Sequence, residues 1–401
     1  MRKLWIAFVL LATYVSIYPF TFQFRPINDE TLRAFLESWR STTSRGDILG
    51  NVVLFVPFGI LGMLAAKPGT QNLRRLLSVC LLGTLFAFVL QVAQFYLPSR
   101  DQDLQDVFWN LLGTVVGATL GMLAGGYLLS SAARARGVRL VPWVLIASWL
   151  FYRLIPFVPS IDFQSIKNSL KPLLLDPELT SFGVFRDAVA WLVIAYLLRY
   201  AQRGRSLSRF LPILILAALS LEVLIVRNWV SASNVLGALV AVVAWFAWLR
   251  HIRRPTRPIA LLMLLMLVVT GTAPFDLRSE PASFAWLPFK GFLGGSMWLN
   301  TQVACEKLFY YGSLVFLLWR TGLNRLLATT AAFLFVLFIE LAQIPLAGHS
   351  PEITDPLLII VAAFAIIALE GLDPRSSRRR QRRSRTQPAD EITSGGGAIG
   401  S

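Results

Sequence analysis

The chain alternates between long apolar segments and short polar ones. Each apolar segment has about the length of a membrane-spanning helix, which needs about 20 residues, and each is bounded by charges, proline or glycine. This pattern predicts an all-α fold, a polytopic transmembrane helix bundle of about 12 spans. The spans are expected at residues 4–20, 47–66, 74–96, 104–129, 140–157, 184–200, 209–226, 230–249, 258–274, 302–319, 323–344 and 353–371. Three of them contain a charge near one end, so 10 or 11 spans is the alternative.

The composition agrees with a membrane protein. Hydrophobic residues make up 55% of the chain and charged residues 15%, against about 45–50% and about 25% in soluble domains. The first segment begins with basic residues but lacks a small-residue cleavage site, so we expect an uncleaved first helix. Both cysteines, Cys80 and Cys305, lie in apolar segments, which excludes a disulfide framework and a cysteine zinc site.

Charge is distributed unevenly along the chain. There are 38 Lys and Arg against 22 Asp and Glu, a formal net charge of +16. If the N-terminus is cytoplasmic, most basic residues fall in cytoplasmic segments and most acidic residues lie on the outer side, as the positive-inside rule requires. We therefore expect a multi-pass protein with both termini in the cytoplasm.

The arginine-rich residues 374–401 lack apolar periodicity and are expected to form a disordered basic cytoplasmic tail. Attraction to anionic lipid headgroups explains such a tail. We therefore expect membrane lipids, and no nucleic acid, as partners.

Three stretches of the chain share a pattern, which predicts an internal repeat. The first, fifth and ninth spans end in a Pro-Phe pair, at residues 19–20, 156–157 and 274–275. Each pair precedes a polar loop and three further spans. We expect three tandem four-helix repeats, at 1–130, 140–250 and 257–371, the second of them degenerate. Repeats with an even number of spans insert in parallel, unlike the inverted repeats of many secondary transporters.

Polar residues of the first and third repeats align without a gap. The alignment pairs Gln91 with Glu340, Gln94 with Gln343, Arg100 with His349, Asp103 with Glu352, and Asp106 with Asp355. The second spans of the three repeats begin with similar sequences, and this similarity places Asp47, Asp187 and Glu306 at corresponding positions. In the second repeat, Glu222 aligns with Gln91 and Asn234 with Asn110.

These polar residues predict a binding pocket at the outer face. Polar groups within apolar helices are costly and usually face partners or cavities, and Asp103, Asp106 and Asn110 share one side of a helix. The pocket would bind a headgroup, phosphate or sugar; the structural alternative is that acids start a helix because its dipole favours them there. The candidate residues are Asp47, Asn51, Gln91, Gln94, Arg100, Asp103, Asp106, Asn110, Glu306, Lys307, Glu340, Gln343, His349, Glu352 and Asp355.

Enzymatic chemistry is only weakly indicated. Paired carboxylates serve in acid–base catalysis or hold divalent metals, and His349, Glu352 and Asp355 would suit a metal. A single loop histidine is more often solvated, so we expect neither a metal nor a cofactor. The sequence has no G-x-S-x-G motif and no phosphate-binding glycine loop.

Two structural features are also predicted. Gly113, Gly117 and Gly121 lie four residues apart, a spacing typical of closely packed helices. Arg153 and Arg227 lie near outer helix ends, where we expect them to snorkel to the interface.

At these motifs the sequence resembles the VanZ-like family, over about residues 15–126 and 270–370. In one variant of the family motif, the helix opens with an acidic residue, a lysine and, four residues after the lysine, a tyrosine. This opening is similar to Glu306, Lys307 and Tyr311. Gln91 stands where the family usually has Glu, so if a carboxylate is required there, the third repeat with Glu340 would be the competent one. The residues that carry the resemblance in the first repeat are Asn51, Phe55, Pro57, Phe58, Gly59, Gln91, Gln94, Arg100, Asp103, Asp106, Asn110, Gly113 and Gly117.

The resemblance implies a bacterial cytoplasmic-membrane protein with a cell-envelope role. The family name comes from a glycopeptide-resistance protein associated with teicoplanin, so an effect on teicoplanin susceptibility is one expectation. Three functions remain open: binding of a lipid-linked or cell-wall component, transport or flipping of a polyprenyl-phosphate-type lipid, and enzymatic action on an envelope lipid through paired carboxylates. Transport would need polar residues through the bilayer, whereas those here gather near one face. A lipid-linked cell-wall precursor is one candidate ligand, but the sequence alone names no ligand and gives no oligomeric state.

Overall fold

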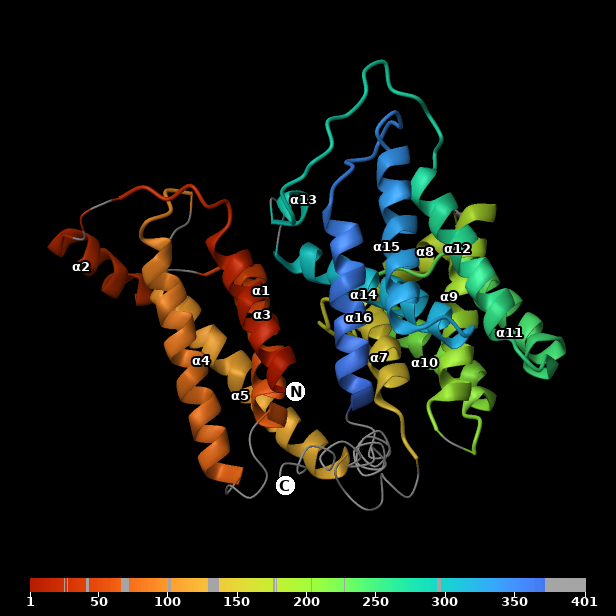
Figure 1. The fold of residues 1–401 in the computed structure, drawn as a ribbon, viewed down its shortest axis with the longest axis horizontal. Helices are drawn as coiled ribbons and strands as arrows, with labels where there is room; N and C mark the ends of the chain where they lie inside the picture. The colour runs from red at the N-terminus through yellow and green to blue at the C-terminus, as the bar shows by residue number, and fades with distance from the viewer. Residues whose placement is uncertain are drawn as a thin grey trace, which may run out of the picture.

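The computed structural model describes residues 1–24, 26, 28–40, 43–65, 72–99, 102–128, 137–175, 177, 179–202, 204–226, 228–293 and 297–371. This part of the chain consists of helices and loops, with isolated β-bridges and no strands. The predicted all-α fold is therefore confirmed (Figure 1). The predicted tail at 374–401 lies outside the described residues.

An α-helix lies within or over each of the 12 predicted spans. The first four are α1 (Arg2–Ile17), α3 (Arg45–Ala65), α4 (Asn72–Gln94) and α5 (Leu104–Leu128). The next four are α7 (Leu140–Leu154), α9 (Ser181–Tyr200), α10 (Leu211–Leu224) and α11 (Ala232–Ala247). The last four are α12 (Thr256–Thr272), α14 (Met297–Arg320), α15 (Arg325–Ala342) and α16 (Thr354–Gly371).

The helices identify a membrane protein. Among the described residues, 6 helices are long and apolar enough to cross a membrane: α3, α4, α5, α9, α11 and α15. Helices α7 and α12 are apolar but shorter. The count of 12 spans and the orientation of the termini stay predictions.

Short helices occupy the loops after α1, α7 and α12. They are α2 (Asp29–Glu37), α8 (Phe163–Leu174) and α13 (Lys290–Leu293). Asn28 caps α2 and Asp162 caps α8, because each side chain accepts a hydrogen bond from a backbone N–H of the first turn. Helices α2 and α13 both lie above the N-terminus in the view of Figure 1.

Glycines let α3 and α5 pack with their backbones in contact. A Cβ on Gly113 would lie 2.2 Å from the carbonyl oxygen of Val52, and one on Gly117 would lie 2.0 Å from that of Val56. Any side chain would therefore separate the two helices. The close packing predicted from the glycine spacing is confirmed.

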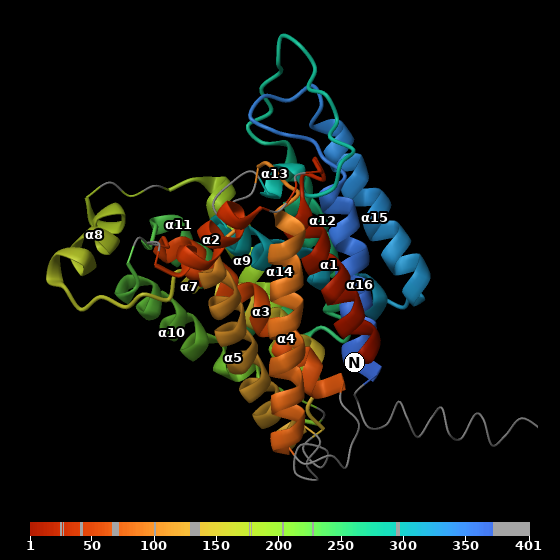
Figure 2. The same ribbon diagram turned by 90° about the vertical axis from the view of Figure 1, so that its left-hand side faces the viewer.

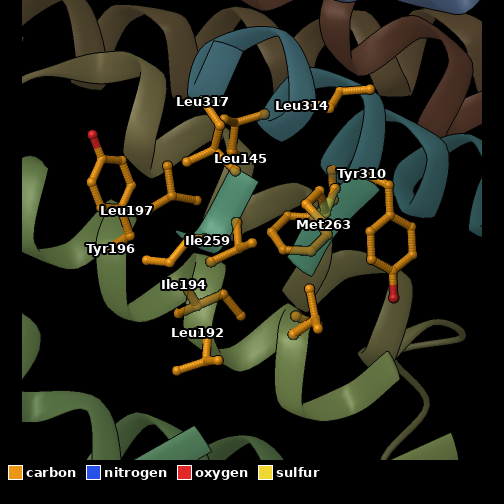
Figure 3. Close-up of a cluster of buried hydrophobic side chains, with 14 of the residues drawn as sticks. Leu145, Leu192, Ile194, Tyr196, Leu197, Ile259, Met263, Tyr310, Leu314 and Leu317 are labelled. Carbon is orange, nitrogen blue, oxygen red and sulfur yellow. The ribbon is translucent and has the colours of Figure 1, made fainter. Parts of the chain in front are cut away.

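The buried core divides into two hydrophobic clusters. Phe55, Phe58 and their neighbours fill the cluster within α1 to α5. The other cluster lies among α7, α9, α12 and α14, where Leu145, Ile194 and Met263 are buried (Figure 3). Figure 2 shows the same helices from the side, with α1 to α5 facing the viewer.

The packing between α7–α11 and α12–α16 is reciprocal. Helix α7, the first long helix of one group, packs against α14, the second long helix of the other, and α12 packs against α9 in the same way. The first long helix of each group thus packs against the second long helix of the other group.

The Pro-Phe pairs form three similar corners at the ends of α1, α7 and α12. In each, the bond before proline is cis and the following residue, Phe20, Phe157 or Phe275, has φ between 57 and 69°. Each phenylalanine N–H also donates to the carbonyl of the residue three positions earlier. The chain therefore leaves the three helices along the same path.

The loops after these corners bind the third long helix of each group in the same way. The fourth residue after each proline donates its N–H to a carbonyl at the end of that helix or in the loop directly after it. These bonds join Gln23 to Tyr96 (2.8 Å), Ser160 to Leu224 (2.8 Å) and Arg278 to Pro345 (2.9 Å).

Candidate functional site

The first polar cluster, Asn51, Gln91, Asp103 and Asp106, joins the ends of α3, α4 and α5. Asn51 Nδ2 donates to Asp106 Oδ1 at 2.6 Å, and Gln91 Nε2 donates to Asp106 Oδ2 at 3.2 Å. Gln91 Oε1 accepts the backbone N–H of Asp103 at 3.2 Å. Two amide side chains thus bind one carboxylate.

The start of α5 explains why this part of the chain carries acids. The Asp103 side chain accepts the N–H of Gln105 at 2.8 Å, so Asp103 caps the helix, and Asp106 lies in its first turn. The helix dipole favours negative charge at both positions. Asp103 therefore both caps α5 and belongs to the polar cluster.

Three further candidates border the first cluster. Asp47, exposed at the start of α3, accepts a hydrogen bond from Ser44 Oγ at 2.6 Å and lies within electrostatic range of Asp106. Asn110 follows Asp106 by one helical turn and is only 5% exposed. Gln94 turns toward α1, where its Nε2 donates to the Ser16 carbonyl at 3.0 Å.

The third polar cluster, Lys307, Tyr311, Glu340 and Asp355, joins α14, α15 and α16. The Lys307 ammonium pairs with Asp355 Oδ1, and the Tyr311 hydroxyl donates to Asp355 Oδ2. Glu340 accepts the N–H of Glu352 at 2.8 Å. Here an internal cation binds the carboxylate.

Two hydrogen bonds recur between the first and third clusters at the aligned positions. Gln91 and Glu340 each accept the N–H of the residue 12 positions later. Gln343 donates to the Gly271 carbonyl at 2.9 Å, as Gln94 does to that of Ser16. Both carbonyls lie three residues before the proline of a Pro-Phe pair. The structure thus brings these aligned residues into matching environments.

The second polar cluster, Arg153, Asp187, Glu222 and Asn234, is a closed ion-pair group. Arg153 binds Glu222 with two hydrogen bonds of 2.6 and 2.8 Å, and its Nη1 lies 3.4 Å from Asp187 Oδ1. Asn234 Nδ2 donates to Asp187 Oδ2 at 2.6 Å. The expected snorkelling of Arg153 is wrong: its side chain is 10% exposed because two carboxylates hold it inside. Arg227 lies outside the described residues.

The hydrogen bonds also correct the alignment of residues 140–250, the predicted second repeat. Leu224, which accepts the loop N–H, follows Glu222 by two residues, as Tyr96 follows Gln94. Glu222 therefore stands in the place of Gln94 and not of Gln91. Asn234 lies in the first turn of α11, as Asp106 does in α5, so it corresponds to Asp106 and not to Asn110.

The remaining candidates lie apart from the clusters or serve the loops. His349 Nε2 lies 2.7 Å from the Ala273 carbonyl, and Glu352 accepts the N–H of Gly291 at 3.3 Å. Glu306 interacts with the Tyr152 hydroxyl of α7. Arg100 lies outside the described residues. Within the described ranges, no group of three or more His, Cys, Asp or Glu is arranged to hold a metal.

The sequence interpretation missed Arg153 and Asn234 as members of a polar cluster. The Arg153–Glu222 bond joins residues 69 positions apart, so no local spacing indicates it. A signal was nevertheless present, because α7 and α10 each place one charge near the end of an apolar segment. A charge in such a position needs a partner.

An apolar groove lies apart from the polar clusters, and none of their side chains lines it. This groove, about 440 Å³, lies among α7, α9 and α10 and is lined by apolar side chains that include Trp143, Leu150 and Phe210. Its chemistry matches hydrocarbon and not a polar group.

One known family matches part of the chain. Residues 5–125 match the model of the family described as VanZ/LLP1. This range extends from α1 into α5 and contains the whole first cluster. The first part of the chain is therefore VanZ-like, as its motifs predicted, while the assignment of residues 257–371 stays a prediction. No curated protein and no solved structure matches the chain.

Proposed function

We propose that this protein resides in a bacterial cytoplasmic membrane and binds the polar group of a lipid-linked or cell-wall component at the outer ends of its helices. The first cluster carries the proposal. It gathers Asn51, Gln91 and Asp106 in the VanZ-like region, at the ends of three helices that are apolar enough to span a membrane. Buried polar groups are expensive at such positions and commonly mark binding sites.

We propose, further, that the chain consists of three repeats, at 1–130, 140–250 and 257–371. The three Pro-Phe corners and the matching loop bonds to Tyr96, Leu224 and Pro345 support this division. The second long helix packs against the fourth in each case, α3 against α5, α9 against α11 and α14 against α16, which supports it as well.

Binding fits the arrangement better than transport or catalysis. Asp106 of the first cluster lies in the first turn of α5, and deeper along α5 the interface with α3 is closed by glycine packing at Gly113 and Gly117. A polar path through the bilayer would have to interrupt such packing. Catalysis on an envelope lipid finds little support, since the paired acids Asp103 and Asp106 are bound by capping and amide contacts.

The test is native mass spectrometry of the full-length protein purified from its source membrane. The wild type should retain an envelope lipid that Asp106→Asn releases. Glu30→Gln, an exposed acid on α2, is the matched control and should retain the lipid. Equal lipid occupancy in the wild type and in Asp106→Asn would contradict the proposal.

A cellular assay tests the envelope role. Cells that express the wild-type protein should differ in teicoplanin susceptibility from cells that express Asp106→Asn at the same level. The comparison with Glu30→Gln separates this effect from a general change in surface charge. Equal susceptibility in all three strains would exclude a teicoplanin-related role.

A further inference from the structure

The first and third clusters differ in one charge at matching positions. Asn51 and Tyr311 both donate to the carboxylate of the fourth long helix, Asp106 or Asp355. Asp47 lies four residues before Asn51, and Lys307 lies four residues before Tyr311. These bonds therefore align Asp47 with Lys307, whereas the sequence pattern aligned Asp47 with Glu306, one residue earlier. A carboxylate thus borders the first cluster at the position where the third cluster has an ammonium group.

Two of the three clusters contain their own cation. Lys307 binds Asp355 in the third cluster, and Arg153 binds Glu222 and Asp187 in the second. Among the described residues, no cationic side chain forms an ion pair with Asp106, whose hydrogen-bond partners are two neutral amides. Within the described part of the chain, the Asp106 carboxylate is therefore bound by neutral donors, in contrast to the carboxylates of the other two clusters.

An unused hydrogen-bond acceptor lies beside this charge. Asn110 is buried, with 5% of its surface exposed, and its Oδ1 has no hydrogen-bond partner. Since Asn110 follows Asp106 by four residues, both side chains lie on the same face of α5. A buried acceptor without a donor is unusual in folded proteins. It indicates that a donor arrives from outside the chain.

We propose that the first cluster binds a primary ammonium group, which takes the place that Lys307 fills in the third cluster. This inference rests on the proposed function and specifies its ligand. An ammonium group carries positive charge and three N–H donors, which match the carboxylates of Asp47 and Asp106 and the free acceptor of Asn110. A phosphate would meet like charge, and a quaternary ammonium would bring no N–H donor.

The ammonium group has two possible sources, which one experiment separates. The full-length protein is titrated with phosphatidylethanolamine, with phosphatidylcholine of the same acyl chains, and with free ethanolammonium, and binding is followed by native mass spectrometry and thermal shift. Preference for phosphatidylethanolamine identifies a lipid headgroup, and saturation by ethanolammonium alone identifies a soluble amine. Equal binding of the two lipids, with no effect of the free amine, would overturn the inference.

Substitutions locate the amine in the first cluster. Asp106→Asn should weaken amine binding about tenfold or more, because a charge-assisted hydrogen bond is lost. Asp47→Lys should do the same by supplying an internal cation. Glu30→Gln should leave binding unchanged. Unchanged amine binding in both Asp106→Asn and Asp47→Lys would place the amine elsewhere and refute the site.

The third cluster offers a reciprocal test that does not depend on a natural ligand. Lys307→Ala removes the internal ammonium group, so ethylammonium should raise the melting temperature of this variant and leave that of Lys307→Arg unchanged. No rescue would contradict the equivalence on which the inference rests. If Asp106 instead proves necessary for a lipid without an amine, the proposed function stands and the ammonium inference fails; if no lipid depends on Asp106, both fail.

Discussion

The first and second polar clusters show two ways to keep a carboxylate among apolar helices. In the first, Asp106 is bound by the neutral amides of Asn51 and Gln91. In the second, the Arg153 guanidinium forms ion pairs with both Glu222 and Asp187. The second arrangement satisfies its charges within the chain, which suits a structural joint between α7, α9 and α10.

The same comparison explains which cluster is suited to binding. A carboxylate that is already paired with arginine must lose that pair before it binds a ligand, whereas one bound by amides keeps its charge available. Asp106 is also partly accessible, while Asp187 and Glu222 are buried. The second cluster thus holds its carboxylates in ion pairs and has Asn234 where the first has Asp106, and the third cluster, with Lys307, lies between the two.

The largest expected effect comes from breaking the closed cluster with Arg153→Met. Glu222 would remain buried without a counterion, and loss of one partner of a buried ion pair costs about 3–5 kcal/mol. The measurement is thermal or denaturant unfolding in detergent. The double variant Arg153→Met with Glu222→Leu should regain much of the loss, because no buried charge at position 222 is left unpaired. A single variant as stable as the wild type would show that the ion pair is not structural.

A smaller loss is expected where α3 and α5 touch. Gly117→Ala places a Cβ 2.0 Å from the Val56 carbonyl oxygen, and such overpacking typically costs about 1–3 kcal/mol. Gly125→Ala is the control, because the nearest atom there is the end of the Leu64 side chain at 3.3 Å. Equal melting temperatures of the two variants would contradict the observed backbone contact.

Asparagine substitutions compare the first and third clusters directly. Asp355→Asn leaves Lys307 without its counterion, at a cost of about 1–3 kcal/mol, whereas Asp106→Asn removes a charge that has neutral partners and should cost less. Unfolding of both variants in the same detergent gives the order. A larger loss for Asp106→Asn would reverse the distinction between the two clusters.

The sequence was sufficient for the positions of the helices and for much of the first and third clusters. Apolar segments bounded by charges and prolines located the long helices, since length and hydrophobicity are local properties. The matched pairs of Gln91 with Glu340 and Gln94 with Gln343 followed from a gapless alignment, and their hydrogen bonds agree with it.

Pairing between distant helices was beyond the sequence. Arg153 meets Asp187 and Glu222 across 34 and 69 residues, and only the packing of the helices determines such contacts. The alignment of Asp47 with Glu306 was off by one residue because an apolar helix offers few polar positions that fix its register. In the second repeat, the same scarcity led to Glu222 being matched with Gln91.

The smallest expected effect tests whether the first and third repeats are equivalent. Gln94→Ala and Gln343→Ala each remove one hydrogen bond from the third long helix to the carbonyl of Ser16 or Gly271. Each variant should lose about 0.5–1.5 kcal/mol, the usual net contribution of such a bond. Because the two bonds lie in separate repeats and share no partner, the losses should add in the double variant. Unfolding of the single and double variants under identical conditions measures these losses. If only one of the two substitutions lowers the stability, the two hydrogen bonds follow the same chain path but do not contribute equally to stability.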